Sequence, residues 1–143
     1  MDNISCFKND DICVFISEMQ INMDRAFEFV RSDNSGAISS FVGCVRADNV
    51  DGKMVESLLY TAYIPMALRG LMKIATDLKI TDKGIKRIYI QHRTGMVHVG
   101  EASVMIVVSR ERTEQVFDNV KCILDKVKRT VPIWKKNIFK PLI

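Results

Sequence analysis

The sequence predicts a single α+β domain in which helices pack on a mixed or antiparallel β-sheet. Its 143 residues, 48% of them apolar, are enough for one domain with a sizeable core. Segments with strand-like apolar patterns are separated by three segments with the apolar period of a helix. Their order, β-α-β-β-α-β-β-α-β, is typical of this class. No internal repeat, low-complexity segment or linker interrupts residues 1–143, so we expect one domain.

The first part of the chain predicts two strands and a helix. Residues 12–16 form a short apolar strand. Asn22 is a favourable N-cap for a helix whose apolar stripe recurs at i, i+3, i+4 and i+7. That stripe consists of Met23, Ala26, Phe27 and Val30. Turn residues 32–36 then lead into a strand over residues 37–46.

The middle of the chain predicts a hairpin and a second helix. Asp51-Gly52 is a hairpin signal, and residues 55–63 supply the returning strand. Pro65 is suited to the first position of a helix because its missing amide proton has no partner there. The buried face of this helix comprises Leu68, Leu71, Met72, Ala75 and Leu78.

The last part predicts two strands, a helix and a final strand. The strands cover residues 85–93 and 102–109. The helix covers residues 112–129, with an apolar face of Val116, Phe117, Val120, Ile123, Leu124 and Val127. Pro132 lacks an amide proton and forces the preceding residue into an extended conformation, so the helix ends before it. Residues 134–139 then predict a short strand.

Composition excludes several classes of function. The longest uninterrupted apolar run, residues 104–108, is far too short to span a bilayer, and residues 1–12 lack the apolar centre of a secretory signal. Four cysteines without C-x-x-C spacing, and two histidines without ligand-spaced partners, argue against a zinc site or a disulfide framework. We therefore expect a cytoplasmic protein with reduced thiols, no metal and no membrane contact.

The net charge of +4 is concentrated in one region. Residues 121–140 carry a local charge of +6, so the remaining 123 residues sum to −2. A dedicated nucleic-acid binder is usually basic over its whole domain and interleaves aromatic residues with its cations. Here Trp134 is the only aromatic residue of the basic stretch before Phe139, so we expect no nucleic-acid partner. A focused site for a small anion or an acidic protein tail fits this distribution better.

The stretch KRTVPIWKK provides the strongest candidates for chemistry. A lysine such as Lys128 in a last helical turn is favoured by the helix dipole, by about 0.3–1 kcal/mol, with no function needed. However, Pro132 turns the chain, and we expect a buried Trp134 to anchor the turn so that Lys128 and Lys135 face one pocket. Two such ammonium groups can move protons or stabilise a developing oxyanion.

Other candidates are weaker on spacing alone. Arg46 ends a strand, where an ordinary solvated position and a clamp for phosphate or carboxylate are both consistent with the sequence. His92 is in phase with Ile88 and Ile90, which favours a buried, hydrogen-bonded histidine over a catalytic base. Cys44 is expected to be a small core residue. The residues alone thus predict a small α+β domain with a basic pocket near its last helix.

Four stretches resemble the large, catalytic subunit of molybdopterin synthase: GAISSFVGCVR, YTAYIPMA, HRTGMVHVGEASVMIVVS and LDKVKRTVPIWKK. The resemblance covers residues 37–139 and implies an α/β hammerhead fold with an added small antiparallel sheet. It also implies transfer of sulfur to cyclic pyranopterin monophosphate from the thiocarboxylated C-terminus of a small ubiquitin-like subunit. The implied assembly is a heterotetramer around a central homodimer, and the reaction needs no metal or other cofactor.

The resemblance also assigns roles to residues. Lys128 and Lys135 match the two catalytic lysines of the family, the first beside the thiocarboxylate and the second beside the reacting region of the pterin. Substrate-binding positions of the family match Cys44, Val45, Arg46, Arg112, Thr113, Lys136 and Asn137.

Three of these matches depart from the family pattern. Arg112 and Thr113 stand where the family usually has a His-Arg pair, and Asn137 replaces an acidic residue. These departures support an alternative, in which the chain is a non-catalytic relative that acts as a protein-interaction or scaffold module.

Overall fold

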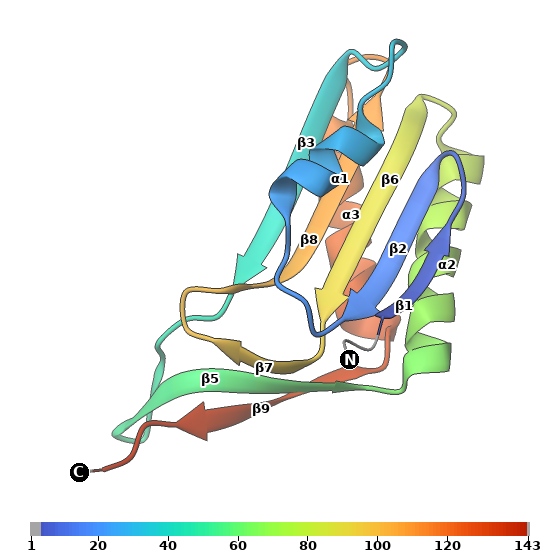
Figure 1. The fold of residues 1–143 in the computed structure, drawn as a ribbon. Helices are drawn as coiled ribbons and strands as arrows, with labels where there is room; N and C mark the ends of the chain where they lie inside the picture. Colours follow the sequence, from blue (N-terminus) through green and yellow to red (C-terminus); the bar gives the residue numbers. More distant parts are fainter. Residues whose placement is uncertain (1–3, 143) are drawn as a thin grey trace.

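The computed structural model describes residues 4–142, which form two β-sheets and three helices (Figure 1). The five-stranded sheet has the order β1-β2-β6-β8-β3, and β5 of the second sheet pairs with β4, β7 and β9. The strands are β1 (Ile4–Lys8), β2 (Ile12–Ser17), β3 (Ala37–Cys44), β4 (Asn49–Val50), β5 (Lys53–Ala62), β6 (Ile85–Arg93), β7 (Gly95–His98), β8 (Ala102–Arg110) and β9 (Ile133–Phe139). The helices are α1 (Met23–Val30), α2 (Ile64–Thr81) and α3 (Val116–Thr130). The predicted α+β class, with an added antiparallel sheet, is confirmed.

Helices cover both faces of the five-stranded sheet. The sheet is mixed, because β2 and β6 pair in parallel whereas all its other neighbouring strands pair antiparallel. In Figure 1, α1 crosses one face, and α2 and α3 lie behind the other. The side chains of β2 and β6 alternate between two apolar clusters. Ile88 and Ile90 belong to the α2/α3 cluster, whereas Phe15 and Tyr89 belong to the α1 cluster. Burial on both faces explains the nearly continuous apolar runs of the central strands.

The second sheet lies across one end of the first. Figure 1 shows β5 and β9 running side by side beneath the ends of β6 and β8. The ends of β3 and β8 nearest this sheet are Cys44 and Ala102, which are cross-strand partners. At the opposite end, Ala37 pairs with Arg110. Residues 111–115, which connect β8 to α3, therefore lie far from the β5/β9 sheet.

Most predicted elements are present, with differences at their ends. Asn22 caps α1, because its Oδ1 accepts a hydrogen bond from the Arg25 amide at 3.2 Å. The predicted start of the last helix at Arg112 is wrong: Gln115 adopts a left-handed conformation (φ 64°) and α3 begins at Val116. Phe117 was expected on the buried face, yet it is 78% exposed. The short strands β1, β4 and β7 were not predicted.

A buried polar network ties the far end of the sheet to both long helices. Arg110 Nη1 donates hydrogen bonds to Asp82 Oδ2 and, at 2.9 Å, to Asn119 Oδ1. Asn119 Nδ2 also donates to Asp82 Oδ2 at 3.1 Å. Burial alone would raise the pKa of Asp82, but the hydrogen bonds from Arg110 and Asn119 outweigh it and hold that pKa below its ordinary value. This ion pair therefore contributes to stability only while Asp82 is ionised.

In residues 4–142, no helix combines the length and apolar character needed to cross a membrane.

Candidate active site

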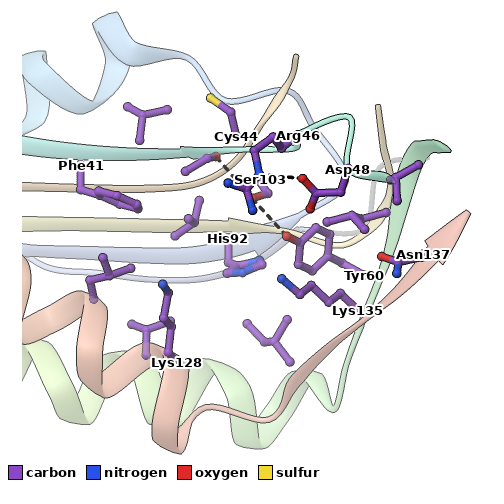
Figure 2. Close-up of a pocket in the computed structure, with 18 residues that line it drawn as sticks. Phe41, Cys44, Arg46, Asp48, Tyr60, His92, Ser103, Lys128, Lys135 and Asn137 are labelled. Atoms are coloured by element: carbon purple, nitrogen blue, oxygen red, sulfur yellow. Dashed lines mark hydrogen bonds and ion pairs between the residues drawn. The ribbon is translucent and has the colours of Figure 1, made fainter. Parts of the chain in front are cut away.

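A cavity of about 680 Å³ opens where α3, the end of the five-stranded sheet and the β5/β9 sheet meet (Figure 2). Apolar residues of β3, β5 and α3 form much of its wall, among them Phe41, Leu58 and Leu124. Its polar and ionisable lining residues are Cys44, Arg46, Asp48, Tyr60, His92, Ser103, Lys128, Lys135 and Asn137. Segments far apart in the sequence therefore build a single site.

The turn after α3 brings the two lysines together. Lys128 lies in the last helical turn, and the helix ends at Thr130, followed by the extended C-cap Val131 before Pro132. The chain then enters β9, which runs antiparallel to β5 and places Lys135 opposite Tyr60. Lys128 and Lys135 both line the cavity, and Figure 2 shows their side chains directed toward it from α3 and β9. The predicted shared pocket of the two lysines is present.

The predicted anchor of this turn is wrong. Trp134 is 59% exposed, because on β9 its neighbours Ile133 and Lys135 face the cavity and Trp134 points to the other side. Val131, only 7% exposed, packs into the core instead. It lies so close to α2 that a Cβ added at Gly70 would be 3.3 Å from Val131 Cγ2. The branched side chain before the proline therefore holds the turn, and the tryptophan does not.

Substitutions are expected to show that Val131 contributes more to stability than Trp134 does. Val131→Ala should lower the free energy of unfolding by about 2 kcal/mol, because it removes buried methyl groups and leaves a cavity. Trp134→Ala should change it by less than about 1 kcal/mol, because the ring is largely in solvent. Urea unfolding of both variants measures the difference, and equal losses would contradict this assignment.

Arg46 projects from a short loop after β3. A register shift between Gly43 and Cys44 precedes the last pair of β3 and β8, which joins Cys44 to Ala102. Val45 is buried and its amide and carbonyl bond to Glu101 O and Gly100 N, which fixes the loop. The Arg46 Nε–Asp48 Oδ1 distance is 2.8 Å, but the Arg46 side chain is 85% exposed. Such an exposed pair is weak, so an anionic ligand can compete with Asp48 for the guanidinium.

Two hydrogen-bonded side chains, Tyr60 and His92, complete the polar lining. The Tyr60 hydroxyl donates to Ser103 Oγ at 3.3 Å, and Ser103 Oγ donates to the Gly43 carbonyl at 3.3 Å. His92 Nδ1 lies 2.8 Å from the Arg93 carbonyl, and its ring contacts Tyr60 edge-on with centroids 5.1 Å apart. Burial lowers the pKa of His92, and the bond to Arg93 offsets this only in part. The predicted buried, hydrogen-bonded histidine is confirmed, and it also faces the cavity.

The other predicted site residues fall into two groups. Cys44 and Asn137 line the cavity, and Cys44 is exposed, so its expected place in the core is wrong. Lys136 is exposed on β9 but is not part of the lining. Arg112 and Thr113 lie in the exposed turn before α3, at the far end of the sheet. Within this chain they do not reach the cavity.

Sequence reasoning did not identify Tyr60, Ser103 and Asp48 as cavity residues. Tyr60 could have been found from its position opposite Lys135, but that pairing depends on the register of β5 and β9. The lining residues include three basic side chains, Arg46, Lys128 and Lys135, and a single carboxylate, Asp48. The cavity is therefore suited to an anionic ligand that also carries apolar or aromatic surface.

Comparisons with known proteins identify the family of this chain. The family model described as MoaE protein matches residues 16–130. The molybdopterin synthase catalytic subunit of Dictyostelium discoideum is 41% identical over 133 residues, which cover 92% of this chain and 84% of the relative. The human molybdopterin synthase catalytic subunit is 40% identical over 133 residues, covering 93% of this chain and 69% of the relative.

Solved structures show the same fold. Molybdopterin synthase from Staphylococcus aureus superposes with a TM-score of 0.81 at 29% identity, covering 94% of both chains. A complex of subunits 1 and 2 of the molybdopterin-converting factor from Helicobacter pylori superposes with a TM-score of 0.72 over 90% of both chains, at 21% identity. The matched family model spans most of the chain, from β2 through α3, and the chain therefore belongs to the MoaE protein family.

Proposed function

We propose that this chain is the catalytic subunit of a molybdopterin synthase. It transfers sulfur from the thiocarboxylated C-terminus of a small ubiquitin-like subunit to cyclic pyranopterin monophosphate and so forms the dithiolene of molybdopterin. The observation that carries the proposal is the convergence of Lys128, Lys135 and Arg46 on one cavity. Each transfer exchanges one oxygen of the substrate for one sulfur and returns the small subunit with a carboxylate.

The cations have distinct roles in this proposal. Lys128, at the C-terminal end of α3, polarises the thiocarboxylate and stabilises the charge that develops during transfer. Lys135 lies beside the reacting carbons and neutralises charge as a carbon–oxygen bond breaks. Arg46 holds the phosphate through its guanidinium fork. Cys44 and Asn137, which line the cavity, and their chain neighbours Val45 and Lys136 are further substrate-binding positions in this proposal.

The partners follow from the same reaction. The small ubiquitin-like subunit inserts its C-terminal tail into the cavity, and two copies of the chain form the centre of a heterotetramer. Arg112 and Thr113 lie at the end of the sheet opposite the cavity. If they bind substrate, they do so in the cavity of the second copy. We further propose that residues 1–143 act as one domain in the cytoplasm, where the four cysteines remain reduced.

The role of Lys135 gives a direct test. Lys135→Ala should lower kcat/KM for cyclic pyranopterin monophosphate by about 100-fold, because a charge contact to the reacting region is lost. The matched control is Lys140→Ala, which removes an exposed lysine just after β9 that does not line the cavity. Steady-state assays with the thiocarboxylated small subunit measure both. Equal activities of the two variants would remove Lys135 from the site.

The alternative function is a non-catalytic interaction module that binds the tail of the small subunit without turnover. The exposed positions of Arg112 and Thr113, away from the cavity, are the observation that favours it. The identity to catalytic subunits over more than nine-tenths of the chain favours the enzyme. Binding of the tail without any dithiolene product would establish the alternative.

A further inference from the structure

The Tyr60 hydroxyl in the cavity wall can only accept a further hydrogen bond. A backbone carbonyl has no proton, so Ser103 must use its single hydroxyl proton on the Gly43 carbonyl. The Tyr60 hydroxyl must then donate its own proton to Ser103 Oγ. What Tyr60 still offers to a ligand is a lone pair. The backbone of β3 thus fixes the polarity of a side chain on β5.

A second backbone carbonyl likewise determines which ring nitrogen of His92 carries the proton. The Arg93 carbonyl can only accept, so His92 Nδ1 carries the proton of the neutral ring. Nε2 is left without a proton, and Nδ1 is the only atom of the His92 ring that forms a hydrogen bond within residues 4–142. Burial lowers the pKa of His92 and thereby favours the neutral ring. Its side chain is held by the β6 backbone and by the edge-on contact with Tyr60.

These two acceptors contrast with the three cations of the polar lining. The cations of the cavity, Arg46, Lys128 and Lys135, are donors only. Figure 2 shows His92 and Tyr60 next to each other on the sheet side, with Lys128 and Lys135 directed toward the same space. A ligand that satisfies the whole cavity therefore needs both an anionic group and N–H or O–H donors. Phosphate alone provides only the first.

We propose that His92 Nε2 and Tyr60 Oη form an acceptor pair that determines specificity by receiving hydrogen bonds from the N–H groups of the pterin ring of the substrate. This inference rests on the proposed function, since it assigns the pterin to that cavity. A pterin carries ring N–H and amino donors, whereas its phosphate is recognised by the cations. A partly buried acceptor left without a donor is costly, so heterocycles without matching donors are rejected.

Binding of the two parts of the substrate can be measured separately. Hydroxymethylpterin, which has no phosphate, is titrated by its fluorescence, and inorganic phosphate is titrated by phosphorus NMR, each on the full chain. His92→Phe keeps an aromatic ring but removes the acceptor. It should weaken pterin binding about tenfold and change phosphate binding by less than about twofold. Tyr60→Phe keeps its ring contact with His92 and should show the same selectivity.

The control is His98→Phe, which changes the other histidine, an exposed residue of β7 outside the cavity lining. It should leave both affinities unchanged. Wild-type pterin affinity in His92→Phe and Tyr60→Phe would overturn the proposal. Equal loss of pterin and phosphate binding would also overturn it, because the residues would then act only on the shape of the cavity. If His92→Phe does not fold, Tyr60→Phe decides alone by the same two results.

Failure of the acceptor pair can be distinguished from failure of the proposed function. A wild-type chain that gives no dithiolene product, yet binds pterin in a manner dependent on His92, would reject the enzyme and retain the acceptor pair. Normal turnover with an unchanged KM for cyclic pyranopterin monophosphate in His92→Phe would retain the enzyme and reject the acceptor pair.

Discussion

Lys128→Ala is expected to reduce the rate of dithiolene formation by a factor of about 100–1,000, the loss typical when one preorganised stabilising group is removed. Its fold should be preserved, because an exposed lysine at a helix end contributes at most about 1 kcal/mol through the helix dipole. The complex with the small subunit should also persist, since most of that contact lies outside one ammonium group. Single-turnover kinetics measure the rate, and thermal unfolding measures stability.

The matched control for this variant is Lys126→Ala, which removes a lysine from the same helix that does not line the cavity. We expect its turnover to remain within about twofold of the wild-type rate, since surface substitutions away from a site have small effects. Normal turnover by Lys128→Ala would remove Lys128 from the chemistry. An equal loss in both variants would show that the rate depends on the general charge of the helix and not on the Lys128 ammonium group in particular.

Arg110→Met is expected to lower the free energy of unfolding by about 3 kcal/mol, because it leaves the Asp82 carboxylate without its cation. The Arg110 side chain is 8% exposed and that of Asp82 is 19% exposed, so water compensates the loss only in part. The control is Arg112→Met in the exposed turn, which should change stability by less than about 0.5 kcal/mol. Urea unfolding of both variants measures this. Similar stabilities would show that the buried network contributes little.

The same network predicts a dependence of stability on pH. The folded-state pKa of Asp82 lies below its ordinary value of 3.8. Its contribution is therefore fully present above the unfolded-state pKa and is lost as the pH falls from about 4 through the lower folded-state pKa. Arg110→Met should flatten this part of the stability profile, because the cation that lowers the pKa is gone. An unchanged acid limb in the variant would contradict the assignment.

The fold was predictable where apolar periodicity and turn chemistry agree. The stripe through Val120, Ile123 and Val127 defines α3, and Pro132 defines its end. The start of α3 was missed because the left-handed Gln115 is an uncommon N-cap without a sequence signature. The short β4 and β7 strands exist only through their pairing with β5, which no local pattern encodes.

The charged residues of the site were predictable from the sequence, but its hydrogen-bond acceptors were not. Lys128 and Lys135 share a sequence stretch, so their convergence followed from one turn. The acceptor character of Tyr60 and His92 depends on the Gly43 and Arg93 carbonyls, whose positions arise from the ends of β3 and β6. Trp134 was misplaced because strand alternation on β9, rather than hydrophobicity, directs Ile133 and Lys135 toward the cavity and Trp134 away from it.

Sulfur transfer by this chain can be measured in a single-turnover reaction of the purified chain with thiocarboxylated small subunit and cyclic pyranopterin monophosphate. The dithiolene product is read as a fluorescent pterin after oxidation. We predict product that depends on the thiocarboxylate and disappears when the carrier ends in an ordinary carboxylate. A chain that binds the small subunit and the substrate but forms no product would contradict the proposed sulfur transfer.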